Sequence, residues 1–309
     1  MKTLSNILGL CAFVFLSVGC ADEHYSVSEV TTGIFYHQGV DEDATESNIG
    51  AIANVGFIIG EKCVAVIDSG GSYLEGRYLR REIKSHTDLP ICYVINTHVH
   101  PDHILGNAAF KEDAPEFIGH EKLPAAIAAR QSYFAKTFQQ ILGKAYVGTE
   151  FIDPSLTVSV GEPITIDLGN RVLTLTAYST SHTDNDLTVL DNTTKTLWTG
   201  DLLFIKRIPA LDGSINGWLK TMHQLQTMDL NFVIPGHGKA GSKQWQQGLI
   251  DQIRYFTVLR TEIRKIIDNM GTIDEATETV GLEEAKNWEL FPLYHRRNIT
   301  ASFVELEWE

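Results

Sequence analysis

The chain has 309 residues, 43% of them hydrophobic, so it is long enough to bury the core of one large domain or of two smaller ones. Its formal net charge of -14 at pH 7 argues against anionic polymers as substrates, because tight nucleic-acid binding needs a positive surface. The basic clusters Arg77/Arg80/Arg81 and Arg296/Arg297 are short, and we interpret them as solvated helix faces or local ion pairs. We therefore expect a small-molecule substrate and no nucleic-acid partner.

Residues 1–20 are predicted to be an export signal. A lysine precedes an apolar stretch, residues 7–18, which is too short to cross a bilayer comfortably and ends in small residues. Residues 17–20 resemble a bacterial lipobox, which predicts lipid on Cys20 and an outer-membrane location. The alternative is ordinary cleavage after Ala21 and release into the periplasm. Either route carries the protein across the inner membrane, and the lipid would be its sole membrane contact.

The rest of the chain is predicted to alternate strands with helices, without repeats. The predicted elements are, in chain order, a strand at Cys63–Ile67, a helix at Tyr73–Arg81, a strand at Ile91–Ile95, a helix at Pro124–Leu142, paired strands from Ile164 to Phe204 with a hairpin turn at Asp191–Lys195, a strand at Phe232–Ile234 and a helix at Trp245–Met270. Before them, Asp41–Asn48 is either a hairpin tip at the mouth of a site or a solvated acidic turn. Cys63 and Cys92 fall on strands expected to be neighbours, where they form either a disulfide or, as we favour, two buried thiols.

Three histidines and a carboxylate lie within six residues directly after the strand at Ile91–Ile95, in Thr97-His98-Val99-His100-Pro101-Asp102-His103. Imidazole and carboxylate donors without thiolate suit zinc above all, with iron or manganese as alternatives. Four donors from one turn are too many for a single ion that must also hold a water, but they suit two ions. His182, Asp201 and His237 supply the remaining donors, each beside loop-forming Gly, Ser, Thr or Pro and near a strand-like run.

The order of these motifs resembles the metallo-β-lactamase superfamily, from about Ile34 to His237. Within that superfamily, the stretches 95–110, 200–204 and 305–309 are most similar to the quinoprotein relay system zinc metallohydrolases. The resemblance implies an α/β fold, the four-layer αββα sandwich. It also implies one domain over residues 21–309, with a C-terminal helical extension from about residue 245.

The resemblance also implies a role for each candidate site residue. The first metal would be held by His98, His100 and His182, the second by Asp102, His103 and His237, and Asp201 would bridge the two. Asp102 would also act in catalysis by orienting the nucleophile. Asp68 would order the ligand turn without binding metal. Candidate substrate-binding residues are Lys206, Arg207 and His120.

These roles predict a hydrolase with two zinc ions, which would activate a water for attack on a small ester, lactone, thioester or amide-like substrate. A functional link to quinone-dependent dehydrogenases in the periplasm is a further expectation. One alternative is hydrolysis of β-lactams, which the carboxylate at Asp201 disfavours. Mono-iron persulfide dioxygenases share the same motif residues, so metal and redox chemistry stay open. An alternative of another class is a metal-binding relay or accessory protein without turnover, whose metal sites would be closed to solvent.

Overall fold

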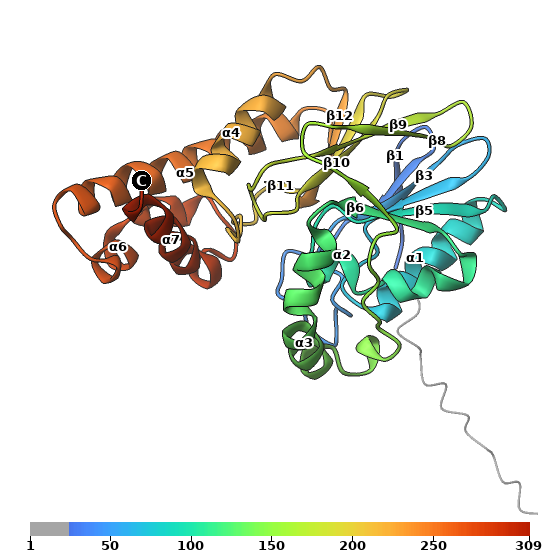
Figure 1. Ribbon diagram of the computed structural model, residues 1–309, viewed down its shortest axis with the longest axis horizontal. Coiled ribbons are helices and arrows are strands. Elements are labelled where there is room, and N and C mark those ends of the chain that lie inside the picture. Colours follow the sequence, from blue (N-terminus) through green and yellow to red (C-terminus); the bar gives the residue numbers. More distant parts are fainter. Residues whose placement is uncertain (1–24) are drawn as a thin grey trace, which may run out of the picture.

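Two β-sheets lie face to face in the middle of the molecule, and helices cover their outer faces (Figure 1). This computed structural model describes residues 25–309. The predicted export signal and the lipid site at Cys20 lie outside the described residues. The layers are therefore helix, sheet, sheet and helix, and the predicted αββα sandwich is confirmed.

The first sheet has seven strands in sequence order. They are β1 (Ser28–Thr31), β2 (Ile34–His37), β3 (Val55–Ile59), β4 (Val64–Ile67), β5 (Ile91–Ile95), β6 (Glu116–His120) and β7 (Leu156–Val158). The pairs from β1 to β4 are antiparallel, whereas β4 to β7 pair in parallel. The apolar run Ile91–Ile95 is thus a parallel strand, as its composition predicted.

The second sheet has five strands in the order β12-β11-β10-β9-β8. Their bounds are β8 (Ile164–Asp167), β9 (Val172–Ala177), β10 (Leu187–Asp191), β11 (Thr196–Phe204) and β12 (Phe232–His237). The turn predicted at Asp191–Lys195 is confirmed, because β10 ends at Asp191 and β11 begins at Thr196. Asp191 closes this turn by accepting a hydrogen bond from the Thr194 N–H, 3.1 Å away.

The helices join and cover these strands. They are α1 (Tyr73–His86), α2 (Pro101–Ile104), the 3-10 helix η2 (Asn107–Asp113), α3 (Leu123–Leu142), η3 (Gly143–Tyr146), α4 (Ile215–Gln226), α5 (Gln244–Asp268), α6 (Ile273–Thr279), η4 (Leu282–Lys286) and α7 (Phe291–Glu307). The helix expected over Tyr73–Arg81 extends to His86. Its first turn is capped by Ser72, whose side chain accepts a hydrogen bond from the Glu75 N–H.

Apolar side chains fill the spaces between the layers. Ile58 and Ile67 of the first sheet and Leu175 and Val189 of the second belong to one fully buried cluster between the sheets. Because burying apolar surface is the main driving force of folding, this cluster fixes how the two sheets meet. The positions where their strands end are fixed with them, and the candidate site lies there.

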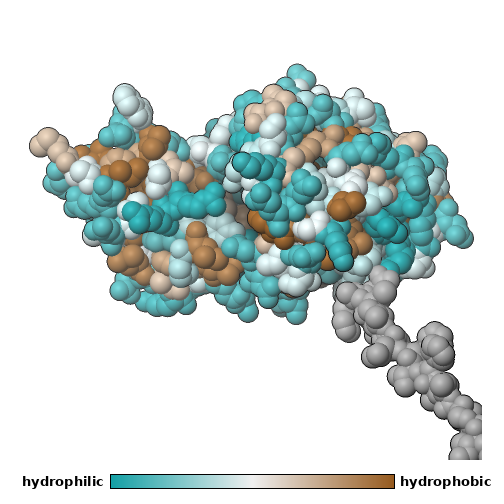
Figure 2. All heavy atoms as spheres, turned by 90° about the horizontal axis from the view of Figure 1, so that it is seen from below, coloured by the Kyte–Doolittle hydropathy of each residue, from teal (hydrophilic) through white to brown (hydrophobic). Residues whose placement is uncertain are grey.

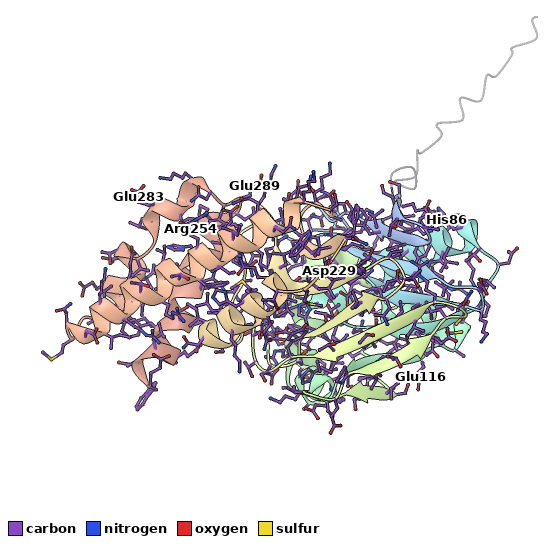
Figure 3. The ribbon with its side chains drawn as sticks, turned by 90° about the horizontal axis from the view of Figure 1, so that it is seen from above. His86, Glu116, Asp229, Arg254, Glu283 and Glu289 are labelled. Atoms are coloured by element: carbon purple, nitrogen blue, oxygen red, sulfur yellow. The ribbon has the colours of Figure 1, made fainter. Side chains whose placement is uncertain are left out.

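The C-terminal helices α5, α6 and α7 extend to one side of the sandwich (Figure 1). Their buried residues Tyr255, Phe256 and Ile299 form one cluster with residues of β11 and α4, such as Leu203 and Trp218. On the outer side of α5, Arg254 (labelled in Figure 3) forms a 3.0 Å ion pair with Glu284. These helices thus share a core with the second sheet.

No helix in residues 25–309 combines the length and the apolar character that crossing a membrane requires. Figure 2 shows hydrophilic residues over most of one face, with small hydrophobic patches, several of them over the C-terminal helices. Cys63, which is buried, and Cys92 are free thiols.

Candidate metal centre

The ligand turn begins where β5 ends and carries its donors in irregular backbone. His98 lies within this bend, His100 is the N-cap of the short helix α2, and His103 lies inside α2. Pro101 starts the helix at a position where a missing N–H costs nothing. The change from bend to helix lets successive donors point toward one region, which a regular strand would not allow.

The other donors come from the second sheet. His182 lies in the segment between β9 and β10, and His237 is the last residue of β12. The sequence placed Asp201 beside a loop, but β11 continues through it to Phe204, with an irregular register around Gly200. Gly200 has φ +50°, and a Cβ there would lie 2.6 Å from Thr97 Oγ1. Glycine therefore permits the close approach of β11 to the ligand turn.

Three imidazole nitrogens converge in the first donor group. His100 Nδ1 lies 3.1 Å from His98 Nε2 and 2.9 Å from His182 Nε2. A carboxylate oxygen of Asp201 lies 3.4 Å from His182 Nε2. Four donors of this type around one point match a site for a divalent metal.

The second donor group adjoins the first through Asp201. Asp102 Oδ2 lies 3.3 Å from His237 Nε2, and Asp201 Oδ2 lies 3.4 Å from the same nitrogen. The other oxygen of Asp201 lies 3.1 Å from His103 Nε2. Both of these last two atoms are buried without a hydrogen-bond partner among the described residues. Buried polar atoms need a partner, and a metal ion bound here would supply one.

Each donor histidine has one ring nitrogen that points away from the donor groups, and another residue contacts that nitrogen. These contacts are His98 Nδ1 with Thr97 Oγ1 at 3.0 Å, His100 Nε2 with Asp212 Oδ2 at 3.2 Å, His103 Nδ1 with Asp68 Oδ2 at 2.7 Å, His182 Nδ1 with the Ala210 carbonyl at 2.7 Å and His237 Nδ1 with the Ile52 carbonyl at 2.8 Å. Such contacts fix the ring and its tautomer, as is usual for histidines that bind metal.

Asp68 stands behind the ligand turn, where the resemblance placed it. Its carboxylate accepts hydrogen bonds from the Thr97 N–H and the Thr97 hydroxyl, both at 2.8 Å, besides its contact with His103. Asp68 is buried, and its backbone has φ +54°, a conformation that L residues adopt rarely. Asp68 thus ties the end of β4 to the donor turn that follows β5.

The site's electrostatics suit cations. Burial raises the pKa of Asp201, but the surrounding histidines outweigh it and hold that pKa well below its usual range. Burial lowers the pKa of His182 to about 3, so this ring is neutral and its lone pair is available. Burial also disfavours the charged form of His103, but Asp201, Asp68 and Asp102 together raise its pKa well above the ordinary value.

A cavity of about 560 Å³ adjoins both donor groups, and His100, Asp102, Asp201 and His237 line it. Helix α3 forms one wall, while the segment after β11 and helix α7 form the other. Asp43 and Ala44 lie at the cavity too, so the acidic segment Asp41–Asn48 does reach the site.

The three candidate substrate residues take different places. Arg207 lines the cavity. Lys206 is exposed with φ +67° and is not among the lining residues. His120 is fully buried, and its ring contacts the Tyr178 carbonyl and the Lys122 N–H, so it does not line the cavity either.

Four cavity residues carry no motif in the sequence. Asp212 and Arg130 form a 3.4 Å ion pair between the segment after β11 and α3. Tyr294 and Arg297 come from α7. Arg130, Tyr294 and Arg297 lie on helices whose sequence pattern does not tell which face meets a cavity, and Asp212 lies in a loop.

The comparisons with solved structures agree with the fold. The metallo-beta-lactamase from Pontibacter korlensis is similar in structure, with TM-score 0.61 and 18% identity over 76% of this chain and 99% of that chain. The metallo-beta-lactamase from Hirschia baltica gives TM-score 0.57 and 16% identity over 75% of this chain and 97% of that one. A double mutant of the sec-alkyl sulfatase PisA1 gives TM-score 0.65 and 17% identity, over 83% of this chain but 45% of the sulfatase chain.

At these identities the solved structures support the fold alone. No curated protein matches the chain. The family model described as the metallo-beta-lactamase superfamily matches residues 49–237, more than half of the chain, and this range holds all seven donors. The chain therefore belongs to the metallo-beta-lactamase superfamily.

Proposed function

We propose that the protein is a hydrolase with two zinc ions that acts on a small ester, lactone, thioester or amide-like substrate. The observation that carries the proposal is the arrangement of seven donors in two groups, with Asp201 between them. A single ion would use three or four of these donors and leave the others as unpaired buried polar groups.

When bound, such ions lower the pKa of a water and polarise the bond under attack. Asp102 is suited to hold the second ion and to orient the attacking water, because its carboxylate lines the cavity. Arg207 and the α3 wall are suited to hold the substrate beside it. An open cavity next to both donor groups supports an enzyme over a relay protein with closed metal sites.

The test is hydrolysis of a panel of lactone, thioester, β-lactam and phosphodiester substrates by zinc-loaded protein, with Asp201→Ala as the matched variant. We expect turnover of at least one carbonyl substrate, no turnover by the variant, and loss of at least one metal from a variant that still folds. Asp201 would offset the charge of two bound dications, so its removal would leave them in stronger mutual repulsion. Retention of both metals and full activity in the variant would refute the proposed role.

We also propose export, with lipid on Cys20 and a functional link to quinone-dependent dehydrogenases. The support is the signal-like N-terminal sequence and the resemblance to the quinoprotein relay enzymes. A Cys20→Ser variant should leave the membrane fraction, and unchanged fractionation would show that Cys20 carries no lipid. Deletion of the protein from its host should slow quinone-dependent alcohol oxidation, and normal oxidation would remove the link.

A further inference from the structure

Helix α7 lies outside the part of the chain that matches the family model, yet it forms part of the wall of the metal cavity. The match ends at residue 237, whereas α7 places Tyr294, Arg297 and Asn298 on the lining. The matched domain therefore supplies the donors, and a segment beyond it shapes the space beside them.

Arg207 on this wall is a buried cation. It is 4% exposed, and its guanidinium donates to the Glu42 carbonyl at 3.0 Å and to the Tyr294 hydroxyl at 3.2 Å. Among residues 25–309 it forms no ion pair with a carboxylate. A guanidinium has more N–H donors than these two acceptors use, and a buried charge without a counter-ion is costly.

Arg297 adds a second positive charge beside the same aromatic ring. The guanidinium carbons of Arg207 and Arg297 lie 5.6 Å and 6.0 Å from the centre of the Tyr294 ring. Arg297 also lacks a carboxylate partner among the described residues. Burial raises the pKa of Tyr294 to about 12, so its hydroxyl is neutral and donates to Asp43, 2.6 Å away. The Tyr294 ring and the Asp43 carboxylate offset part of the charge of the two arginines, but within residues 25–309 Asp43 forms no ion pair with either of them.

The opposite wall differs in chemistry. Helix α3 presents Tyr133, Phe134, Phe138 and Ile141 to the cavity. The lining residue Arg130, also on α3, is paired with Asp212. The cavity thus has an apolar side on α3 and a cationic side at Arg207 and Arg297, with the metal donors at its base.

We propose that Arg207 and Arg297 form an anion-binding subsite, and that the substrate carries an oxyanion group together with an apolar body that lies against α3. This inference rests on the proposed hydrolase function and names the class of its substrate. The two guanidiniums would hold a carboxylate or a sulfur oxyanion, leaving the bond to be cleaved near the donors.

Binding of inert ligands to the zinc-loaded protein tests the subsite without requiring turnover. The probes are phenylbutanoate, phenylbutanesulfonate and the uncharged phenylbutanamide, titrated by calorimetry. Sulfonate is included because it is a poor zinc ligand, so its binding reports on the arginines more than on the metals. We expect both anions to bind about tenfold more tightly than the amide.

The variants Arg207→Gln and Arg297→Gln should bind both anions more weakly and bind the amide as tightly as the wild type does. Arg207→Gln should lower the affinity for both anions about tenfold. Arg297→Gln should lower it less, because solvent screens the exposed charge of Arg297. The matched controls are Arg296→Gln and Lys206→Gln, which remove exposed neighbouring charges that do not line the cavity. Zinc content and thermal unfolding report whether each variant folds.

Equal binding of the amide and the two anions to the wild type would overturn the inference, whether or not any variant folds. The inference would also be overturned if both arginine variants bound the anions as tightly as the wild type, or if the carboxylate alone bound tightly. Either result would mean that the metals hold the anion. If no substrate of the panel is hydrolysed but the anions still bind as expected, the proposed function is refuted and the anion-binding subsite stands.

Discussion

At the scale of single residues, the site depends on side chains that hold the donors as much as on the donors themselves. The dense cluster at residues 98–103 indicated four donors, because closely spaced histidines and carboxylates are rare outside metal sites, while the family resemblance implied the other three donors and Asp68. The sequence did not indicate Asp212, because a single aspartate in a loop has no distinguishing pattern. Only the fold brings its carboxylate to His100 Nε2, 3.2 Å away.

Replacing Asp212 with Ala should weaken zinc binding at the first donor group about 10- to 100-fold, the usual cost of losing the partner of a metal-bound histidine. Competition with a chelator measures this affinity. Asp229→Ala is the matched control, because Asp229 is an exposed surface carboxylate labelled in Figure 3, with a side chain 85% exposed. Equal zinc affinity in the two variants would show that Asp212 does not support His100.

Zinc binding should release protons near neutral pH, and the zinc affinity should rise with pH. Burial disfavours the charged forms of His103 and His237, but nearby carboxylates raise the pKa of both rings in the metal-free chain. These raised pKa values stabilise the metal-free fold at low pH, and that contribution is lost as the pH rises through them. Zinc takes the place of these protons.

Calorimetry in two buffers of different ionisation enthalpy counts the protons that zinc releases. An affinity that stays constant between about pH 6 and pH 8, without proton release, would contradict this reading of the two histidines.

At the scale of secondary structure, periodicity and turn residues predicted most elements but not how far they extend. The strand Ile91–Ile95 and the turn at Asp191–Lys195 appear where the sequence placed them. The paired strands were predicted to reach Phe204, and β11 ends there, although Gly200 and Asp201 are turn-forming residues in isolation. Contact with β12 on one side and with the ligand turn at Gly200 keeps this segment in the sheet.

Asp191 anchors the turn between β10 and β11 and also the start of β9. It is fully buried, and its oxygens lie 3.2 Å and 2.9 Å from Arg171 Nε and Nη2. Asp191→Ala should lower the free energy of unfolding by about 3–5 kcal/mol, because it leaves the buried guanidinium without its partner. Chemical denaturation measures the change. A loss no larger than that of Asp229→Ala would show that the pair contributes nothing to stability.

At the scale of the whole molecule, the sequence predicted the layers and the edge where the donors meet, but not the cavity. Its walls come from α3, the segment after β11 and α7, which are far apart in sequence and brought together by tertiary packing. The basic pair Arg296/Arg297 had been interpreted as a solvated helix face or as part of local ion pairs. In the structure both arginines are exposed, but only Arg297 of the two also lines the cavity.

The metal content of the purified protein tests the central claim most directly. Elemental analysis after zinc reconstitution should give two zinc ions per chain, because the donors form two groups joined by Asp201. One tightly held iron per chain, with no zinc recovered after reconstitution, would contradict both the stoichiometry and the hydrolase.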